Sequence, residues 1–152
     1  MSVSAYNSGD MAQLDGVLDT TGREFAASIE NVEGVPEPHR SHFARTLWIE
    51  ERPVACFGVW PLQAGVGRAW SILTEQAIAN PMALYRGVLR QLVAFERDEE
   101  LIRVESVVKV GHPTAHEWIQ HLGFERETMD CGMRCYGLEG ETYHLYARVR
   151  SL

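Results

Sequence analysis

Lysine is almost missing from this chain, since Lys109 is its only lysine and all its other basic residues are arginine. The chain therefore offers few primary amines on which it could itself be acylated. Basic residues as a class are also outnumbered, because 14 of them face 21 acidic residues and leave a net charge of −7. A dedicated nucleic-acid-binding domain usually carries the opposite sign or a clear basic stripe. We therefore expect no nucleic-acid partner.

Long apolar runs are missing too. No run approaches the roughly 20 residues that a membrane-spanning helix needs, so no membrane association is expected. The N-terminal stretch MSVSAYNSGDMAQ has neither a basic region nor an apolar core, so it does not have the pattern of an export signal. The cysteine count is an odd three, which favours free thiols in a reducing compartment. These absences predict a cytoplasmic protein.

The composition that is present is that of an ordinary globular domain. Apolar residues make up 45% of the chain and charged residues 23%, which excludes an intrinsically disordered protein. A chain of 152 residues fits one domain. It can bury enough surface to fold without disulfides or structural metals. We therefore expect a single domain over residues 1–152.

Hydrophobic spacing and breaker residues place the expected elements along the chain. Strands are predicted over Ser2–Tyr6, Leu47–Glu50, Val54–Trp60, Arg68–Glu75, Leu101–Val110, Phe124–Cys135 and Glu141–Val149. Helices are predicted after the N-cap Asp10 (with Met11, Leu14, Val17 and Leu18), over His39–Leu47, over Met82–Arg97 and over Pro113–Leu122. Hairpin strands combined with strand–helix units predict an α/β fold with a mixed central sheet of about six or seven strands and about four helices.

This order is strand, two helices, three strands, helix, strand, helix and two strands, and it resembles the GCN5-related N-acetyltransferase (GNAT) fold. The most specific part runs from Gly111 through the Leu-Gly-Phe of residues 122–124. Family members typically have an asparagine, an alanine three residues later, a tyrosine four residues after that, and then Leu-Gly-Phe. Here Ala115 matches the alanine, while His112 and Ile119 stand at the asparagine and tyrosine positions.

The run from Trp70 to Gly123 is also similar to small GNAT-like internal virion proteins of short-tailed bacteriophages, the podoviruses. In that branch the acetyltransferase motifs are similarly reduced. The resemblance implies a host-cytoplasmic protein or a virion component, with a phage structural protein or a host protein as its partner.

The GNAT resemblance also implies an acetyl-CoA site where the third hairpin strand meets the long helix. In the family a Gln or Arg and two small residues open that helix, so that free N–H groups can bind the pyrophosphate. Gln76 fits the first position, but Ala79 replaces the first glycine and Pro81 the last small residue. Alanine crowds the approach of a phosphate and proline lacks an N–H. The residues expected at this site are Leu73, Thr74, Gln76, Ala79, Asn80 and Met82.

Two side chains are candidates for the base that deprotonates an amine substrate. Glu75 ends the strand that would run beside the acyl group, and the alternative for it is an exposed carboxylate at a strand end. His112 ends the following strand and titrates near neutrality, and its alternative is a helix-capping histidine. His112 and His116 are four residues apart, which suits chelation, but no carboxylate at the spacing of a known zinc motif accompanies them, so no metal is expected. The usual acid is a tyrosine, and Ile119 at its position cannot donate a proton.

Two hypotheses remain open at this point. The chain is either a non-catalytic GNAT-fold phage protein that works in virion assembly or binds a host protein, or an acetyl-CoA-dependent N-acetyltransferase acting on a small-molecule or protein amine. The replaced residues at positions 79, 81 and 119 favour the first hypothesis. The element order and Gln76 favour the second.

Overall fold

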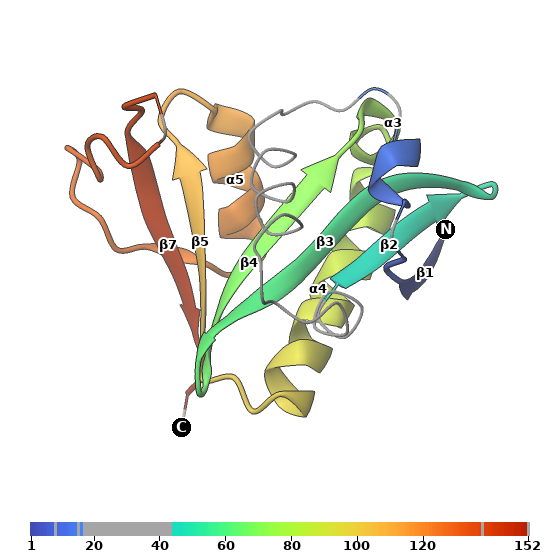
Figure 1. Cartoon of the computed structure of the whole chain (residues 1–152), viewed down its shortest axis with the longest axis horizontal. Coiled ribbons are helices and arrows are strands. Elements are labelled where there is room, and N and C mark those ends of the chain that lie inside the picture. The colour runs from blue at the N-terminus through green and yellow to red at the C-terminus, as the bar shows by residue number, and fades with distance from the viewer. Residues whose placement is uncertain (8, 15, 17–43, 138, 152) are drawn as a thin grey trace. The chain divides into compact units, whose positions relative to one another are not determined.

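The computed structural model describes residues 1–7, 9–14, 16, 44–137 and 139–151 (Figure 1). The chain forms two compact units. The first comprises Met1–Trp60 and Ala69–Phe95, and the second comprises Pro61–Arg68 and Glu96–Leu152.

The described residues form seven strands, numbered along the chain, and their order in the sheet is β1-β2-β3-β4-β5-β7-β6. The β4–β5 pair is parallel, whereas β1–β2, β2–β3, β5–β7 and β6–β7 are antiparallel, so the sheet is mixed as predicted. The strands are β1 (Ser2–Ala5), β2 (Ala44–Ile49), β3 (Arg52–Gln63), β4 (Val66–Leu73), β5 (Arg103–Lys109), β6 (Glu125–Arg126) and β7 (Tyr143–Val149). The helices are the 3-10 turn η1 (Met11–Gln13), α3 (Glu75–Ile78), α4 (Pro81–Asp98) and α5 (Pro113–His121).

In the first unit β2 is covered on both faces. On one face Thr46, which is completely buried, donates a hydrogen bond from its hydroxyl to the Asp10 carboxylate at 2.6 Å. Asp10 also accepts the backbone amide of Asn7 at 2.9 Å. On the other face Arg45 places its guanidinium 4.9 Å from the ring centre of Phe95 on α4. Alternate residues of β2 therefore serve two different layers, as the period of a strand dictates.

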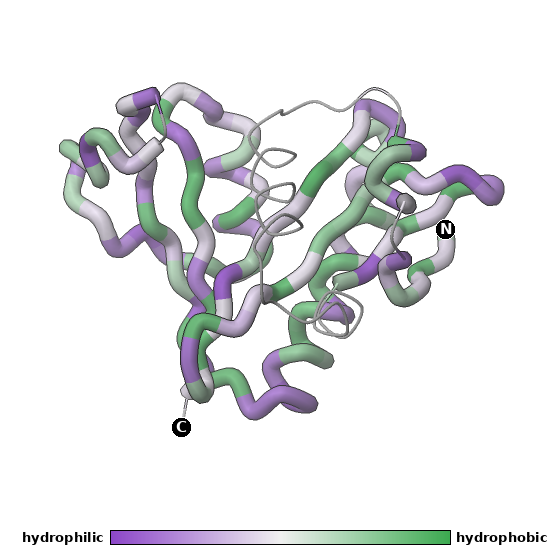
Figure 2. Tube along the Cα trace, viewed as in Figure 1, coloured by the Kyte–Doolittle hydropathy of each residue, from purple (hydrophilic) through white to green (hydrophobic). Residues whose placement is uncertain are grey.

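The long helix α4 packs tightly because Gly87 has no side chain. A Cβ atom at Gly87 would lie 3.1 Å from the Leu47 side chain of β2, closer than side chains normally approach. The buried side of the helix recurs at helical spacing and consists of Leu84, Val88, Leu92 and Phe95. Figure 2 shows that α4 ends in a hydrophilic stretch and that the β2–β3 turn is hydrophilic as well.

In the second unit β5 and β7 pair along seven residues, from Arg103 opposite Val149 to Lys109 opposite Tyr143. Both strands alternate between two faces. His144, Tyr146 and Arg148 share the face that contacts α5. The other face carries Glu105 and Lys109. The segment between β6 and β7 contributes hydrogen-bond partners to the side-chain networks around each of these two residues.

Most predicted elements are confirmed, and two need correction. The helix predicted over His39–Leu47 is wrong where it can be compared, because Ala44–Leu47 belong to β2 and residues 39–43 lie outside the described part of the chain. The strand predicted over Phe124–Cys135 is reduced to Glu125–Arg126, and a looped segment follows it. The helix after Asp10 is described only as the short η1, and the Asp10 side chain makes no cap hydrogen bond to it.

Candidate functional site

The residues expected to bind acetyl-CoA form one continuous connection between β4 and α4 in the first unit. Thr74 is the N-cap of α3 and is only 1% exposed. Its hydroxyl donates to the carbonyl of Val54 at 2.7 Å and accepts the amide of Ala77 at 3.3 Å. Side-chain capping of this kind is what threonine does at the first residue before a helix. The start of the β4–α4 connection is therefore fixed by the hydrogen bonds of Thr74.

Four consecutive amides of this connection are already used inside it. The amide of Ala77 goes to the Thr74 hydroxyl, and that of Ile78 goes to the Thr74 carbonyl at 3.2 Å. The amide of Ala79 donates to the carbonyl of Glu75 at 2.9 Å, and that of Asn80 donates to the carbonyl of Ala77 at 3.1 Å. A pyrophosphate bound by this segment would have to displace these hydrogen bonds.

The next two residues, Asn80 and Pro81, add no free donor. Pro81 begins α4 and has no N–H. The side-chain amide of Asn80 donates to the carbonyl of Gln76 at 3.0 Å. From Ala77 to Pro81 the segment therefore lacks the free amides with which a glycine-rich loop would bind the pyrophosphate of acetyl-CoA.

The two proposed bases lie in different units. Glu75 does not end a strand as predicted, because β4 ends at Leu73 and Glu75 begins α3. It is exposed there, and its own amide donates to the carbonyl of Gly16 at 3.0 Å. His112 is exposed and precedes α5 as its N-cap, but its side chain makes no cap hydrogen bond. Each is accessible to solvent, and neither has a side-chain partner among the described residues.

Ile119 occupies the position where the resembled family has its acid. It is 7% exposed on α5, and its carbonyl accepts the amide of Phe124 at 3.3 Å just after the helix ends. The glycine between them, Gly123, has φ +86°, which closes the helix as predicted. This position contributes to packing and has no group that can transfer a proton.

A histidine–tyrosine pair that the sequence did not indicate lies between α5 and β7. His116 Nδ1 is 2.7 Å from the Tyr146 hydroxyl, and His116 Nε2 is 3.1 Å from the carbonyl of Lys109. A carbonyl only accepts, so Nε2 carries a proton and, in the neutral ring, the Tyr146 hydroxyl donates to Nδ1. Burial raises the pKa of Tyr146, which keeps that proton on the hydroxyl.

A second histidine lies next to this pair. The ring of His144 is 5.8 Å from that of His116, edge to face, and its Nδ1 is 2.8 Å from the hydroxyl of Thr128. Burial lowers the pKa of His144, and the neighbouring Arg126 and His116 lower it further. Thr128 also accepts the amide of Leu145 at 3.2 Å. The cluster therefore fastens the start of the β6–β7 connection to β7.

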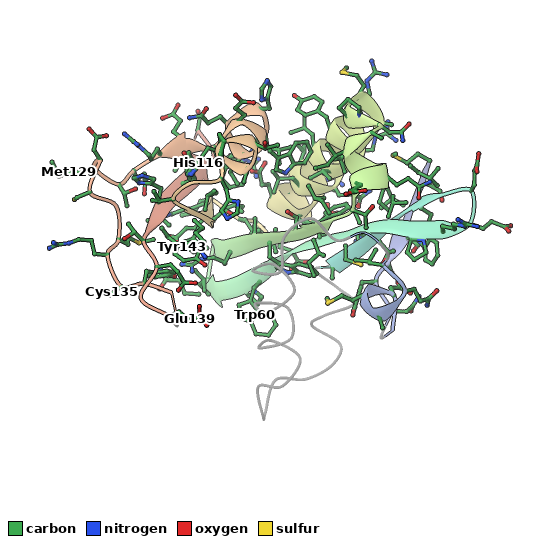
Figure 3. The ribbon with its side chains drawn as sticks, turned by 90° about the horizontal axis from the view of Figure 1, so that it is seen from above. Trp60, His116, Met129, Cys135, Glu139 and Tyr143 are labelled. Carbon is green, nitrogen blue, oxygen red and sulfur yellow. The ribbon has the colours of Figure 1, made fainter. Side chains whose placement is uncertain are left out.

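The β6–β7 connection makes a second set of contacts on the opposite face of β5. Arg68 donates to the carboxylate of Glu105 at 3.0 Å and to the hydroxyl of Tyr136 at 2.8 Å. Burial alone would raise the pKa of Glu105, but hydrogen bonds from Arg103 and Arg68 hold it below its ordinary value. In Figure 3 Met129, Cys135 and Glu139 lie along this connection, and His116 comes from α5.

Among the described residues no group of three or more His, Cys, Asp or Glu side chains is placed to hold a metal ion. Over the same residues no helix is both long and apolar enough to cross a membrane. The three cysteines are free thiols, with Cys56 buried and Cys131 and Cys135 exposed.

No family model and no curated protein matches the sequence. Solved structures do match the fold. Ard1 from Thermoplasma volcanium superposes with a TM-score of 0.69 at 11% identity, covering 99% of this chain and 98% of that one. A ribosomal-protein-alanine N-acetyltransferase from Brucella melitensis gives 0.67 at 11% identity, covering 99% and 100%.

An acetyltransferase of the GNAT family from Bacillus anthracis gives a TM-score of 0.66 at 12% identity, covering 97% of this chain and 93% of that one. The chain has the GNAT fold. The resemblance noted in the sequence is thereby confirmed for the architecture. At such low identity the likeness extends to the fold alone, because one scaffold carries many functions.

Proposed function

We propose that this GNAT-fold chain is a bacteriophage protein that acts by binding another protein, as a component of the virion or its assembly or as a ligand of a host protein. The observation that carries the proposal is the hydrogen bonding of the β4–α4 connection. Four amides that would bind a pyrophosphate are satisfied internally, from Ala77 to Asn80. Because each is already paired, phosphate binding would exchange existing hydrogen bonds for new ones instead of adding bonds.

Two further features support a role without acetyl transfer. Pro81 removes one N–H donor at the start of α4, where free N–H groups would contact a bound anion. Ile119 is a buried apolar residue at the position of the family's acid. The phage assignment itself is supported by the resemblance of residues 70–123 to reduced GNAT-like virion proteins.

A titration of acetyl-CoA into the protein tests the non-catalytic part of the proposal. We expect no saturable heat at millimolar ligand. Mass spectrometry of purified phage particles tests the virion part, and recovery of the chain in stoichiometric amounts is the expected result. Absence from particles together with turnover of acetyl-CoA would refute both parts.

The second candidate is an acetyl-CoA-dependent N-acetyltransferase that acts on a small-molecule or protein amine. It is favoured by the matched structures, whose names describe acetyltransferases. Glu75 and His112 are its candidate bases, and both are exposed. If turnover is found, Glu75→Gln and His112→Ala should each slow it, and an unchanged rate would remove the role of the residue replaced.

A further inference from the structure

The outward side of α4 carries two arginines that make no ion pair with any described residue, on a chain whose net charge is −7. Met82, Arg86, Arg90 and Val93 are all exposed, and we refer to these four residues as the α4 stripe. At 100° per residue they fall within an arc of about 80° on the helix. The buried side of α4, formed by Leu84, Val88 and Leu92, points the opposite way.

The two arginines repel each other and have no local carboxylate to relieve the repulsion. They are four residues apart, which makes them neighbours on the helix surface. The residues three and four positions from each, Met82, Ala83, Leu89, Gly87, Val93 and Ala94, include no acid. Neither arginine takes part in an ion pair with a described residue. About two turns beyond Arg90, Arg97 differs because it pairs with Asp98 at 2.6 Å.

Apolar side chains flank the two charges. Met82 is 60% exposed and Val93 is 46% exposed, at the two ends of three helical turns. Large exposed apolar residues aligned with charges of one sign are typical of a face that binds an amphipathic partner. Their alignment distinguishes this stripe from apolar residues that are scattered singly over a surface.

We propose that the α4 stripe is a docking surface for an acidic amphipathic protein helix. The partner helix would place carboxylates against Arg86 and Arg90 and apolar side chains against Met82 and Val93. Charge complementarity selects this occupant, because the arginines lack a counter-charge and the apolar ends require a partner that is not merely anionic. The inference names the surface for the protein-binding role proposed above and rests on that role.

Nucleic acid fits this surface less well. Two arginines neutralise few phosphates. A polyanion that extends beyond the stripe would also be repelled by the net charge of −7 on the chain. Self-association through the stripe is also disfavoured, since two copies in a symmetric contact would bring their arginines together.

The test uses a fluorescent helical peptide with leucines eleven residues apart and glutamates between them on the same face. A scrambled peptide of equal composition and a short DNA duplex are the comparison probes. Fluorescence anisotropy with the full chain should show binding of the helical peptide that weakens with added salt. The scrambled peptide should bind at least tenfold more weakly.

The double variant Arg86→Glu/Arg90→Glu should weaken peptide binding at least tenfold. Arg134→Glu/Arg150→Glu is the matched control, because both residues are exposed and the change in net charge is the same. The control should bind as the unaltered protein does. Met82→Ser/Val93→Ser should also weaken binding, which separates an amphipathic partner from a simple polyanion. Circular dichroism melting of each variant verifies folding.

Equal losses in both charge variants, equal binding of the scrambled peptide, or stronger binding of the DNA would each overturn the inference. So would a wild-type dimer that Arg86→Glu/Arg90→Glu dissolves, because the surface would then be a self-contact. Acetyl-CoA calorimetry on the same samples keeps the two proposals apart. The peptide can fail to bind while acetyl-CoA also fails to bind, which would contradict only the docking surface. The peptide can also bind to a protein that binds acetyl-CoA, which would contradict only the non-catalytic role.

Discussion

The side-chain oxygen of Thr74 accepts the amide of Ala77 at 3.3 Å, and its proton goes to the carbonyl of Val54 at 2.7 Å. One hydroxyl thus joins β3 to the first turn of α3. Within the same turn, hydrogen bonds occupy the backbone amides that a phosphate-binding loop would keep free. The conformation of the β4–α4 connection is therefore fixed from inside the protein and does not depend on a ligand to order it.

Replacing Thr74 by alanine should destabilise the protein. The change removes an N-cap and leaves the buried Val54 carbonyl with only its bond from the Thr74 amide, so we expect a loss of about 2 kcal/mol. Thr74→Ser keeps the hydroxyl and should lose no more than about 1 kcal/mol. Urea unfolding followed by circular dichroism measures both values. Equal losses in the two variants would show that the hydroxyl is not what holds the turn.

The ion pair between Glu96 and Arg148 should contribute measurably to stability. Arg148 Nε is 2.6 Å from one carboxylate oxygen, and Nη1 donates to the carbonyl of Leu122 at 2.8 Å. Both side chains are largely buried, so Glu96→Gln leaves a poorly compensated charge and should cost about 2 kcal/mol. The control is Asp130→Asn, which breaks the exposed pair with Arg126 and should cost less than about 0.5 kcal/mol. Similar losses would contradict the difference in burial.

Acidification should destabilise the protein through His144. Its folded pKa is lowered by burial and by neighbouring positive charge, so the unfolded chain binds the proton more readily. The contribution of His144 is therefore fully present above the unfolded pKa near 6.5 and is lost as pH falls from there through the lowered folded pKa. His144→Asn keeps a polar group near Thr128 without this titration. Unfolding free energies between pH 7 and about 5 should fall less steeply in the variant, and identical slopes would exclude His144.

Gly132 should tolerate alanine much less well than Gly140. Both have positive φ, +60° and +84°, so each substitution costs about 1 kcal/mol of backbone strain. A Cβ at Gly132 would also lie 2.8 Å from the carbonyl oxygen of Tyr143, whereas at Gly140 nothing lies within 4 Å. We expect Gly132→Ala to cost about 2–3 kcal/mol in total. Thermal melts of the two variants compare them, and equal shifts in Tm would mean that the loop moves to accommodate the methyl group.

The strongly periodic elements could be predicted from sequence because local spacing determines them. Met82–Arg97 and Leu101–Val110 correspond to α4 and β5, and Gly123 ends α5 at φ +86°. The error at residues 44–47 has a physical cause. Ala44–Leu47 have no strong local preference, and pairing with β1 and β3 makes them a strand. The segment after Arg126 is likewise shaped by contacts made far along the chain, including that of Tyr136 with Arg68.

The candidate site was predictable only in outline. The substitutions at 79, 81 and 119 are visible in the sequence, but the internal pairing of the amides from Ala77 to Asn80 required the folded turn. The pair formed by His116 and Tyr146 joins residues 30 positions apart, and no local pattern connects them. The stripe on α4 lay within reach of sequence analysis, since Arg86 and Arg90 have helical spacing. The sequence does not show that both side chains are exposed and make no ion pair with a described residue.

We expect that this GNAT-fold chain does not use acetyl-CoA, and isothermal calorimetry is the direct test. Acetyl-CoA is titrated to millimolar concentration into the folded 152-residue chain. No saturable heat is expected, because the amides of residues 77–80 are already paired and Pro81 offers none. Saturable one-to-one binding at micromolar acetyl-CoA would contradict it and would favour an N-acetyltransferase.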